Sequence, residues 1–264
     1  MPNESKIYFN NLIKDATATA STEATGHAKE YLTDEILKTT WRSTVITSTT
    51  ISLDFAAATP IAGVTLHYHN VVAGDTTYVV EADAAGTYSP ADESENLALV
   101  TRTVKEKNTN GTLTDVTRSD AHYVDDWNYR YYRLRIVKAS GTYIEAGQLA
   151  IWKDVYTFPK NFNVGYTAGQ ENRFSSSTGT AGQEFRKQKF SRFFVSMPFK
   201  NITDAQKDKL VEAGQSDYIA YYHGMTSKLY WGILTVNPPV NVRTIDESAP
   251  AELWNVTATF TESL

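Results

Sequence analysis

The sequence predicts a mainly β protein, in which an N-terminal jelly-roll β-sandwich is followed by a smaller β-sheet domain that carries one α-helix. Short stretches of the chain alternate between apolar and polar residues with a period of two, as half-buried strands do. Turn-forming residues separate these stretches, and only one segment has the signals of a helix. A length of 264 residues is enough for two ordinary domains.

Three segments of the first half show the strand pattern most clearly. Residues 51–55, 64–68 and 132–136 each place apolar side chains on one face and polar ones on the other. The pair Asn110-Gly111 is a strong signal for a hairpin turn. Many short strands with frequent turns are typical of a sandwich or jelly roll.

The second half begins after a shift in composition that follows Trp152. We place the domain boundary near residue 155, so the two domains cover residues 1–155 and 156–264. Residues 165–183 are rich in Ser, Thr and Gly and lack apolar periodicity, which predicts a flexible loop or arm. The strand pattern returns over residues 193–199, and further strands are expected within residues 217–223, 228–236 and 252–261.

The one convincing helix is expected to begin after Thr203. Thr203 as N-cap and Gln206 three residues later form a capping box, in which each side chain bonds to the backbone of the other residue. Asp204 is favourable in the first turn, and Gly214 can close the C-terminus. The order of one strand, one helix and three strands predicts a small sheet with a helix on it.

Charge and cysteine content exclude several classes of protein. Lys and Arg number 25 and Asp and Glu number 30, which gives a net charge of −5. A mildly acidic chain with scattered basic residues argues against a nucleic-acid partner. The absence of Cys excludes disulfides, Cys-ligated zinc and thiol catalysis. No signal-peptide pattern or membrane-spanning run is found, so we expect a soluble protein without membrane insertion.

Several short motifs of the first half follow one another in the order of a known family. They are Asn11-Leu12 with Ala18-Thr19-Ala20-Ser21, the segment from Ala28 to Asp34 that leads to Thr39-Thr40-Trp41, Ile51-Ser52-Leu53-Asp54-Phe55, Ile61-Ala62-Gly63-Val64-Thr65-Leu66, Tyr78 to Glu81 with Gly86-Thr87-Tyr88, Arg130-Tyr131-Tyr132-Arg133-Leu134-Arg135-Ile136, and Glu145 to Trp152. Through these motifs, residues 11–153 resemble the discoidin-like, coagulation-factor type C family of galactose-binding-like jelly rolls. Trp41 is read as a core residue of that fold.

The resemblance implies a binding domain whose ligands meet loops at one end of the barrel. Many members bind sugars or lipid headgroups, and some hold a structural calcium. Asp34 and Glu145 match acidic positions of the family and are the candidate metal ligands. However, Glu35 and Ile36 replace the family's Gly and Asn, and Ca²⁺ takes six or more oxygen ligands. We therefore expect no cofactor, with calcium as the alternative.

No catalytic motif is present, so we expect a protein that is not an enzyme. The sequence has no His-Glu-x-x-His, no P-loop, no dinucleotide-binding glycine motif and no Gly-x-Ser-x-Gly elbow. Asp125 and Asp126 are a visible acid pair, but neighbours on a strand point apart, which favours a loop acid run. His67 and His69 would share a strand face and could hold a transition metal, although two surface histidines without a third ligand are the more common case.

Five residues are candidates for ligand binding: Arg42, His69, Asn70, Tyr123 and Trp127. Tyr123 and Trp127 lie in a predicted loop with amides and acids, a composition that suits stacking on a sugar ring or a protein contact. Arg42 follows Trp41 and is expected near a barrel end. The alternative for the aromatic residues is that they pack back onto the barrel.

The second half resembles, more loosely, modules of tailed-phage tail and virion proteins. The resemblance rests on Arg192-Phe193-Phe194-Val195, on the Thr203-Asp204-Ala205-Gln206 helix start, and on the closing segment from Leu253 to Glu262. The leading hypothesis is a structural component of a phage virion, a tail or capsid-associated adaptor or decoration protein. It would be made in the host cytoplasm, form a homo-oligomer and contact other virion proteins. The alternative is a lectin-like carbohydrate-binding protein, and the two are compatible if the first domain binds host glycans.

Overall fold

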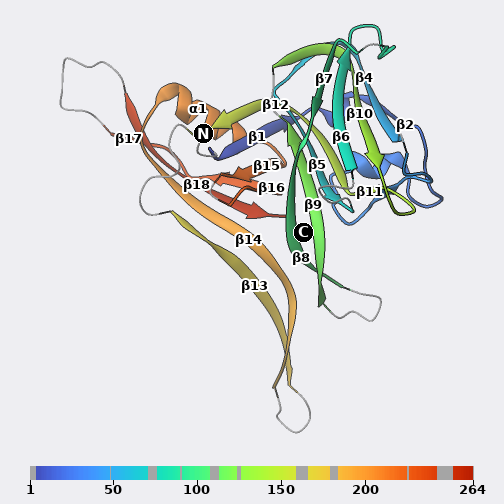
Figure 1. The fold of residues 1–264 in the computed structure, drawn as a ribbon. Coiled ribbons are helices and arrows are strands. Elements are labelled where there is room, and N and C mark those ends of the chain that lie inside the picture. Colours follow the sequence, from blue (N-terminus) through green and yellow to red (C-terminus); the bar gives the residue numbers. More distant parts are fainter. Residues whose placement is uncertain are drawn as a thin grey trace.

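The computed structural model describes residues 4–47, 49–70, 76–89, 91–107, 113–123, 126–158, 166–178, 184–224, 226–242 and 252–263. Within them the chain is mainly β, with one α-helix, α1 (Asp204–Ala213), and two short 3-10 helices, η1 (Ile13–Asp15) and η2 (Lys29–Leu32). The predicted fold class is therefore confirmed. Figure 1 shows two β-rich halves side by side, with a long hairpin that extends away from both.

The strands form one large sheet, a second sheet of five strands and a short two-stranded sheet. The large sheet runs β13-β14-β18-β16-β15-β1-β12-β5-β9-β8, and β17 pairs with β18. Its strands are β1 (Lys6–Asn11), β5 (Gly63–His69), β8 (Ala98–Lys107), β9 (Leu113–Tyr123), β12 (Gln148–Thr157), β13 (Thr167–Thr178), β14 (Glu184–Thr203), β15 (Ile219–His223), β16 (Lys228–Val236), β17 (Val240–Val242) and β18 (Leu253–Glu262). The other sheets contain β2 (Thr17–Ala20), β4 (Thr49–Ile61), β10 (Trp127–Lys138), β6 (Thr76–Asp83) and β7 (Glu93–Asn96), and the pair β3 (Trp41–Arg42) and β11 (Glu145–Ala146).

The jelly roll is a sandwich of the five-stranded sheet and the β12-β5-β9-β8 part of the large sheet (Figure 1). Its apolar core takes residues from both layers, because the alternating pattern of each strand turns one face inward. Leu53 on β4 and Leu134 on β10 are buried as predicted, and Trp41 is fully buried among them. The indole nitrogen of Trp41 donates to the carbonyl of Thr22, so its polar atom is also satisfied.

The period-two pattern of β5 is broken by a bulge near its end. Leu66 pairs with Ala121 and His69 pairs with Ser119, so β5 has two residues where β9 has only Asp120. Tyr68 adopts a positive φ of 59° at this point, and its backbone N–H donates to the buried carboxylate of Asp120 at 2.9 Å. Because of the bulge, the side chain of His69, the last residue of β5, points to the opposite face of the sheet from the one that a regular strand would give it.

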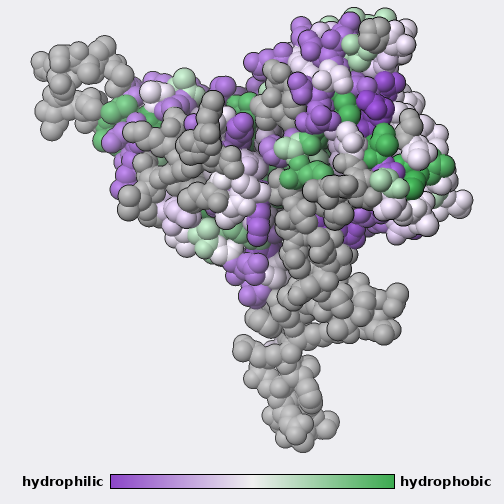
Figure 2. Space-filling model, in the orientation of Figure 1, coloured by the Kyte–Doolittle hydropathy of each residue, from purple (hydrophilic) through white to green (hydrophobic). Residues whose placement is uncertain are grey.

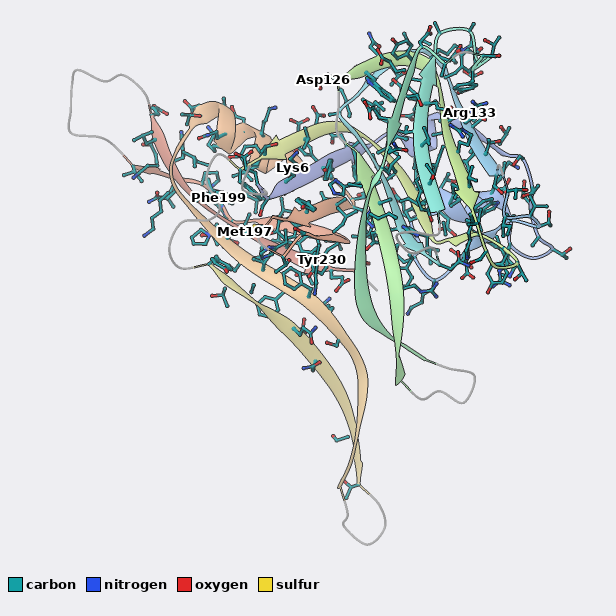
Figure 3. The ribbon with its side chains drawn as sticks, viewed as in Figure 1. Lys6, Asp126, Arg133, Met197, Phe199 and Tyr230 are labelled. Atoms are coloured by element: carbon teal, nitrogen blue, oxygen red, sulfur yellow. The ribbon has the colours of Figure 1, made fainter. Side chains whose placement is uncertain are left out.

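The second half is a sheet of β14, β18, β16 and β15 with α1 packed on one face. The capping box of Thr203 and Gln206 is present, and Gly214 is the C-cap residue, as predicted. Leu210 and Ala213 of the helix contact an apolar core that includes Met197, Phe199 and Tyr230, which Figure 3 labels in the C-terminal half. The predicted strands of this half are thus observed, and the helix covers the sheet.

The two halves share a sheet and a third apolar cluster, which we call the junction core. Strand β1 lies between β12 of the jelly roll and β15 of the second half and pairs antiparallel with both. The large sheet also curls, so that β16 contacts β8 and β9. The junction core fills this curl and consists of Tyr8, Leu37, Tyr68, Ala150, Trp152, Ala220, Tyr222, Leu229 and Trp231. The domain boundary near residue 155 stays a prediction; it falls inside β12.

Residues 165–183 were predicted to form a flexible loop or an arm; the loop alternative is wrong for residues 167–178, which form β13 and pair with β14. The error arose because β13 pairs through its backbone, which needs no apolar periodicity in the sequence. β13 lies at the end of the sheet order, and the hairpin extends from the body of the protein like an arm (Figure 1). Residues 165 and 179–183 lie outside the described part of the chain, as does the predicted Asn110-Gly111 turn.

The described surface of the jelly roll is largely hydrophilic in the view of Figure 2, with smaller apolar areas. A few large apolar side chains are exposed singly, among them Ile36, Val45, Ile233 and Val240. Across the described residues, no helix combines the length and the apolar character that crossing a membrane requires.

Candidate functional site at the β11 end of the jelly roll

A buried glutamate organises the end of the jelly roll where β3 and β11 pair. Glu145 on β11 lies opposite Arg42 on β3, and the Arg42 Nη2 atom donates to Glu145 Oε2 at 3.0 Å. The Glu145 side chain is 11% exposed and that of Arg42 is 31% exposed. A guanidinium that is fixed by a carboxylate in this way keeps its remaining N–H groups in a defined direction.

Arg118 on β9 brings a second guanidinium to the same carboxylate. Its Nη1 atom lies 3.9 Å from Glu145 Oε1, and its guanidinium lies 5.4 Å from the centre of the Tyr68 ring. The β5 bulge determines the position of the Tyr68 ring. The extra residue turns this ring toward the face of the sheet that carries the junction core. The two arginines therefore flank Glu145 from different strands.

Tyr143 and Asn70 complete this end of the barrel. The Arg42 guanidinium lies 4.2 Å from the centre of the half-buried Tyr143 ring, which is a cation–π distance. Asn70 Nδ2 donates to the Tyr143 carbonyl at 3.3 Å, and Asn70 Oδ1 accepts from the Glu145 N–H at 3.0 Å. The Asn70 side chain thus fastens the segment that carries Tyr143 and Glu145 to the end of β5.

We call Arg42, Arg118, Tyr143 and Glu145 the Glu145 site. It offers fixed guanidinium donors, one carboxylate acceptor and an aromatic ring at an end of a rigid sandwich. Planar polar groups of this kind match pairs of neighbouring hydroxyls, and a ring supplies an apolar contact. The described chain therefore holds, at this end, the groups that a small polar ligand with an apolar face needs.

Of the predicted ligand residues, Arg42 and Asn70 are brought together here, and Asn70 acts as a positioning residue. His69 is next to Asn70 but is fully buried, and the prediction that it contacts a ligand is wrong. Its Nδ1 atom lies 3.0 Å from the Tyr78 hydroxyl inside the sandwich. Burial lowers the pKa of His69 to about 4, with the nearby His67 and Arg118 acting in the same direction and Asp120 opposing them.

Tyr123 and Trp127 lie at the opposite end of the sandwich. Tyr123 pairs with Val64 and Trp127 pairs with Ile61, whereas Asn70 lies six residues after Val64, just beyond the end of β5, about 20 Å away at roughly 3.3 Å per residue. Trp127 is 6% exposed and belongs to the jelly-roll core, so it is not offered to a ligand. The alternative of packing onto the barrel is correct for this residue. The side chain of Tyr123 lies outside the described part of the structure.

Asp34 and Glu145, the predicted metal ligands, each have partners within the protein. Asp34 accepts hydrogen bonds from the backbone of Ile36 and from the Thr39 hydroxyl, which makes it the cap of a local turn. Glu145 is occupied by the two arginines. Among the residues described, no group of three or more His, Asp and Glu side chains is placed to hold a metal ion.

His67 and His69 do not share a face, contrary to the prediction, because the bulge at Tyr68 lies between them. The His67 ring lies 5.3 Å from the Trp231 ring in the junction, while His69 points into the sandwich toward Tyr78. Asp125 lies outside the described residues, and Asp126 is exposed, as a loop acid would be. Figure 3 shows Asp126 at the end of the jelly roll far from the β11 label of Figure 1.

Arg118 and Tyr143 are the functional candidates that the sequence did not reveal. Arg118 is 27 positions from Glu145 and Arg42 is 103 positions from it, so only the folded strands bring the three together. The one available signal for Tyr143 was its position two residues before Glu145, where the segment that resembles the last strand of the discoidin-like family begins.

Comparison with solved structures found chains that are similar to about half of this chain. No family model matches the chain, and no curated protein matches it. A chitosan-binding module of Paenibacillus sp. IK-5 has 16% identity and a TM-score of 0.40, and covers 55% of this chain and 99% of its own. A family 32 carbohydrate-binding module of C. perfringens, in complex with galactose, has 10% identity and a TM-score of 0.36, covering 55% and 98%. The lectin-binding domain of lectinolysin, complexed with Lewis b, has 12% identity and a TM-score of 0.40, covering 56% and 99%.

Proposed function

We propose that this protein binds carbohydrate through the Glu145 site. The observation that supports the proposal is the pairing of Arg42 with Glu145 at 3.0 Å while its guanidinium lies 4.2 Å from the Tyr143 ring. A sugar presents hydroxyls along one edge and C–H groups on one face, which correspond to the polar pair and to the ring. Strands β3 and β11 and the Asn70 bonds hold these groups in place before any ligand arrives.

The test is sugar binding by the full chain and by two variants of the site. Arg42→Ala and Tyr143→Ala are each expected to weaken binding at least tenfold on a glycan array and by calorimetry. Arg130 offers a matched control, because it pairs with Asp54 at 2.8 Å and stacks on Tyr131 at 4.6 Å on another part of the jelly roll. Arg130→Ala should leave binding unchanged, and an array without any signal would reject the proposal.

A second candidate function is assembly, as in the predicted virion component. The observation that favours it is the β13–β14 hairpin, which extends from the body and ends the sheet with a strand that pairs, among the described residues, only with β14 (Figure 1). An unpaired strand edge can accept a further strand from another chain. Light scattering after size-exclusion chromatography tests this function, because a protein that stays monomeric at every concentration and with every candidate partner would not fit it.

A further inference from the structure

The β5 bulge is held by a hydrogen bond to the fully buried carboxylate of Asp120. The Tyr68 N–H donates to Asp120 Oδ1 at 2.9 Å, and His67 Nδ1 lies 3.5 Å from the same oxygen. Tyr68 has a φ of 59°, a conformation that residues other than glycine rarely adopt. A hydrogen bond to a charged acceptor is among the stronger ones, so the bond to Asp120 offsets this unfavourable backbone conformation.

The bulge keeps the end of β5 in register with the segment that carries Glu145. Before the bulge, the His67 carbonyl accepts from the Gly147 N–H at 3.1 Å. After the bulge, the Asn70 N–H donates to the Glu145 carbonyl, also at 3.1 Å. Between these two bonds the chain advances by three residues from His67 to Asn70, but by only two from Gly147 to Glu145. With regular pairing, Asn70 would therefore lie one position out of register with Glu145.

Asn70 and Tyr68 connect the bulge to the side chains of the Glu145 site. Asn70 Nδ2 donates to the Tyr143 carbonyl at 3.3 Å, and Asn70 Oδ1 accepts from the Glu145 N–H at 3.0 Å. The Tyr68 ring centre lies 5.4 Å from the Arg118 guanidinium, whose Nη1 atom lies 3.9 Å from Glu145 Oε1. Both connections start at the bulge or within two residues of it. Loss of the bulge would therefore shift Tyr143 and Arg118 relative to Glu145.

We propose that Asp120 is a positioning residue of the Glu145 site. Asp120 is fully buried and does not touch the sugar; its carboxylate holds the bulge, and the bulge sets the positions of the groups that do. This inference rests on carbohydrate binding at the Glu145 site and adds a residue of the sheet interior to it. A ligand binds more tightly when the groups that contact it are already held in place. A looser bulge should therefore lower the affinity for sugar although every contacting side chain is still present.

The test measures sugar affinity by calorimetry on the full chain, with lactose and with the glycan that gives the strongest array signal. Asp120→Ala should weaken binding about tenfold, whereas Asp120→Asn, whose amide oxygen can still accept from the Tyr68 N–H, should stay within about threefold of the parent. Ile61→Ala is the matched control, because Ile61 is buried in the jelly-roll core at the end opposite the Glu145 site. It should lose a comparable amount of stability and keep the affinity of the parent. Near-UV circular dichroism checks that each variant is folded.

A double variant tests whether Asp120 acts through the end of β5. Asn70→Ala and Asp120→Ala loosen the same connection, so together they should bind no more than about twofold more weakly than the weaker single variant. If Asp120→Ala fails to fold, Asp120→Ser replaces it, since its shorter side chain keeps a hydroxyl but brings the oxygen less far toward the Tyr68 N–H. Losses that multiply, or an Asp120→Ala affinity equal to that of the parent, overturn this inference and leave carbohydrate binding intact. A parent chain that binds no sugar overturns both.

Discussion

The jelly-roll core and the junction core lie on opposite faces of the same β-sheet, yet they are built from different chemistry. The jelly-roll core is apolar almost throughout, with Trp41 and Ile51 at its centre. The junction core contains large aromatic rings whose neighbours are the polar groups His67, Asp120 and His122, of which the first two are fully buried. The two halves therefore meet through apolar and aromatic packing, to which His67, Asp120 and His122 add polar contacts.

The largest loss of stability is expected when an indole ring is removed from either core. Trp41→Ala and Trp231→Ala should each lower the free energy of unfolding by about 3–5 kcal/mol, because each leaves a cavity in a fully buried site. Differential scanning calorimetry distinguishes the two cores. Trp231→Ala should destabilise both halves in a single transition, since its ring contacts Trp152 of the jelly roll at 5.6 Å and Tyr218 of the second half at 5.4 Å. A second, separate transition would show that the halves unfold independently.

Acid should weaken the junction through His122. The pKa of His122 is lowered to about 4, chiefly by burial; Lys6, whose position Figure 3 shows, and His67 act in the same direction, and Asp120 opposes them. The Tyr8 hydroxyl lies 3.3 Å from His122 Nδ1, and the Tyr222 ring centre lies 4.7 Å from that of the imidazole, with the two rings tilted by 35°. The unfolded chain takes up this proton near pH 6.5 and the folded chain only near pH 4. Stability is therefore complete above pH 6.5 and falls by up to roughly 3 kcal/mol as the pH drops to 4.

Urea unfolding at pH 7, 5.5 and 4.5 measures this effect, and His122→Gln is the control. The variant keeps a polar side chain that does not titrate, so its stability should depend less on pH than that of the parent protein. The buried His69 remains in both proteins and adds the same dependence to each. Identical slopes for variant and parent would show that His122 is not a source of the acid sensitivity.

Substitutions at the β5 bulge should lower the free energy of unfolding by a smaller amount. Asp120→Ala removes the acceptor of the Tyr68 N–H in a fully buried position and should cost about 2–3 kcal/mol, because the backbone donor is left without this partner. Asp120→Asn keeps an acceptor oxygen and should cost less. Chemical denaturation measures both variants. If the two substitutions proved equally costly, the carboxylate charge, and not the hydrogen bond to the bulge, would be the important feature.

The smallest loss of stability is expected for substitutions at the start of α1, the helix of the second half. Thr203→Ala removes one side of the capping box and should cost about 1 kcal/mol. Trp254→Ala should cost about 1–2 kcal/mol, less than the substitution of a buried Trp, since its ring is half-buried and is held by Asp204 at 2.6 Å and by Lys207 at 4.1 Å. Thermal melting measures both, and a loss for Trp254→Ala as large as that for Trp41→Ala would contradict this ranking.

Local patterns were sufficient to predict much of the fold. The alternation in β4 and β10 and the capping box of α1 depend on residues close in sequence, and each is observed. The bulge in β5 could not be predicted, since it is determined by Asp120 on another strand. β13 was missed because backbone pairing leaves no apolar pattern. The site was predicted only in part, because Arg42 and Arg118 meet Glu145 through the pairing of distant strands.

The position of β1 has a consequence for exchanging parts of this protein. Strand β1 pairs with β12 on one side and with β15 on the other. A segment near the N-terminus therefore completes the part of the sheet that the C-terminal half forms. A fragment ending after β12 would expose the edge of β1 that β15 normally covers, and a fragment beginning at β13 would lack the strand beside β15. The jelly roll is therefore not a portable unit at a cut near residue 155. Recombination that preserves both halves must carry residues 6–11 with whichever half keeps β15.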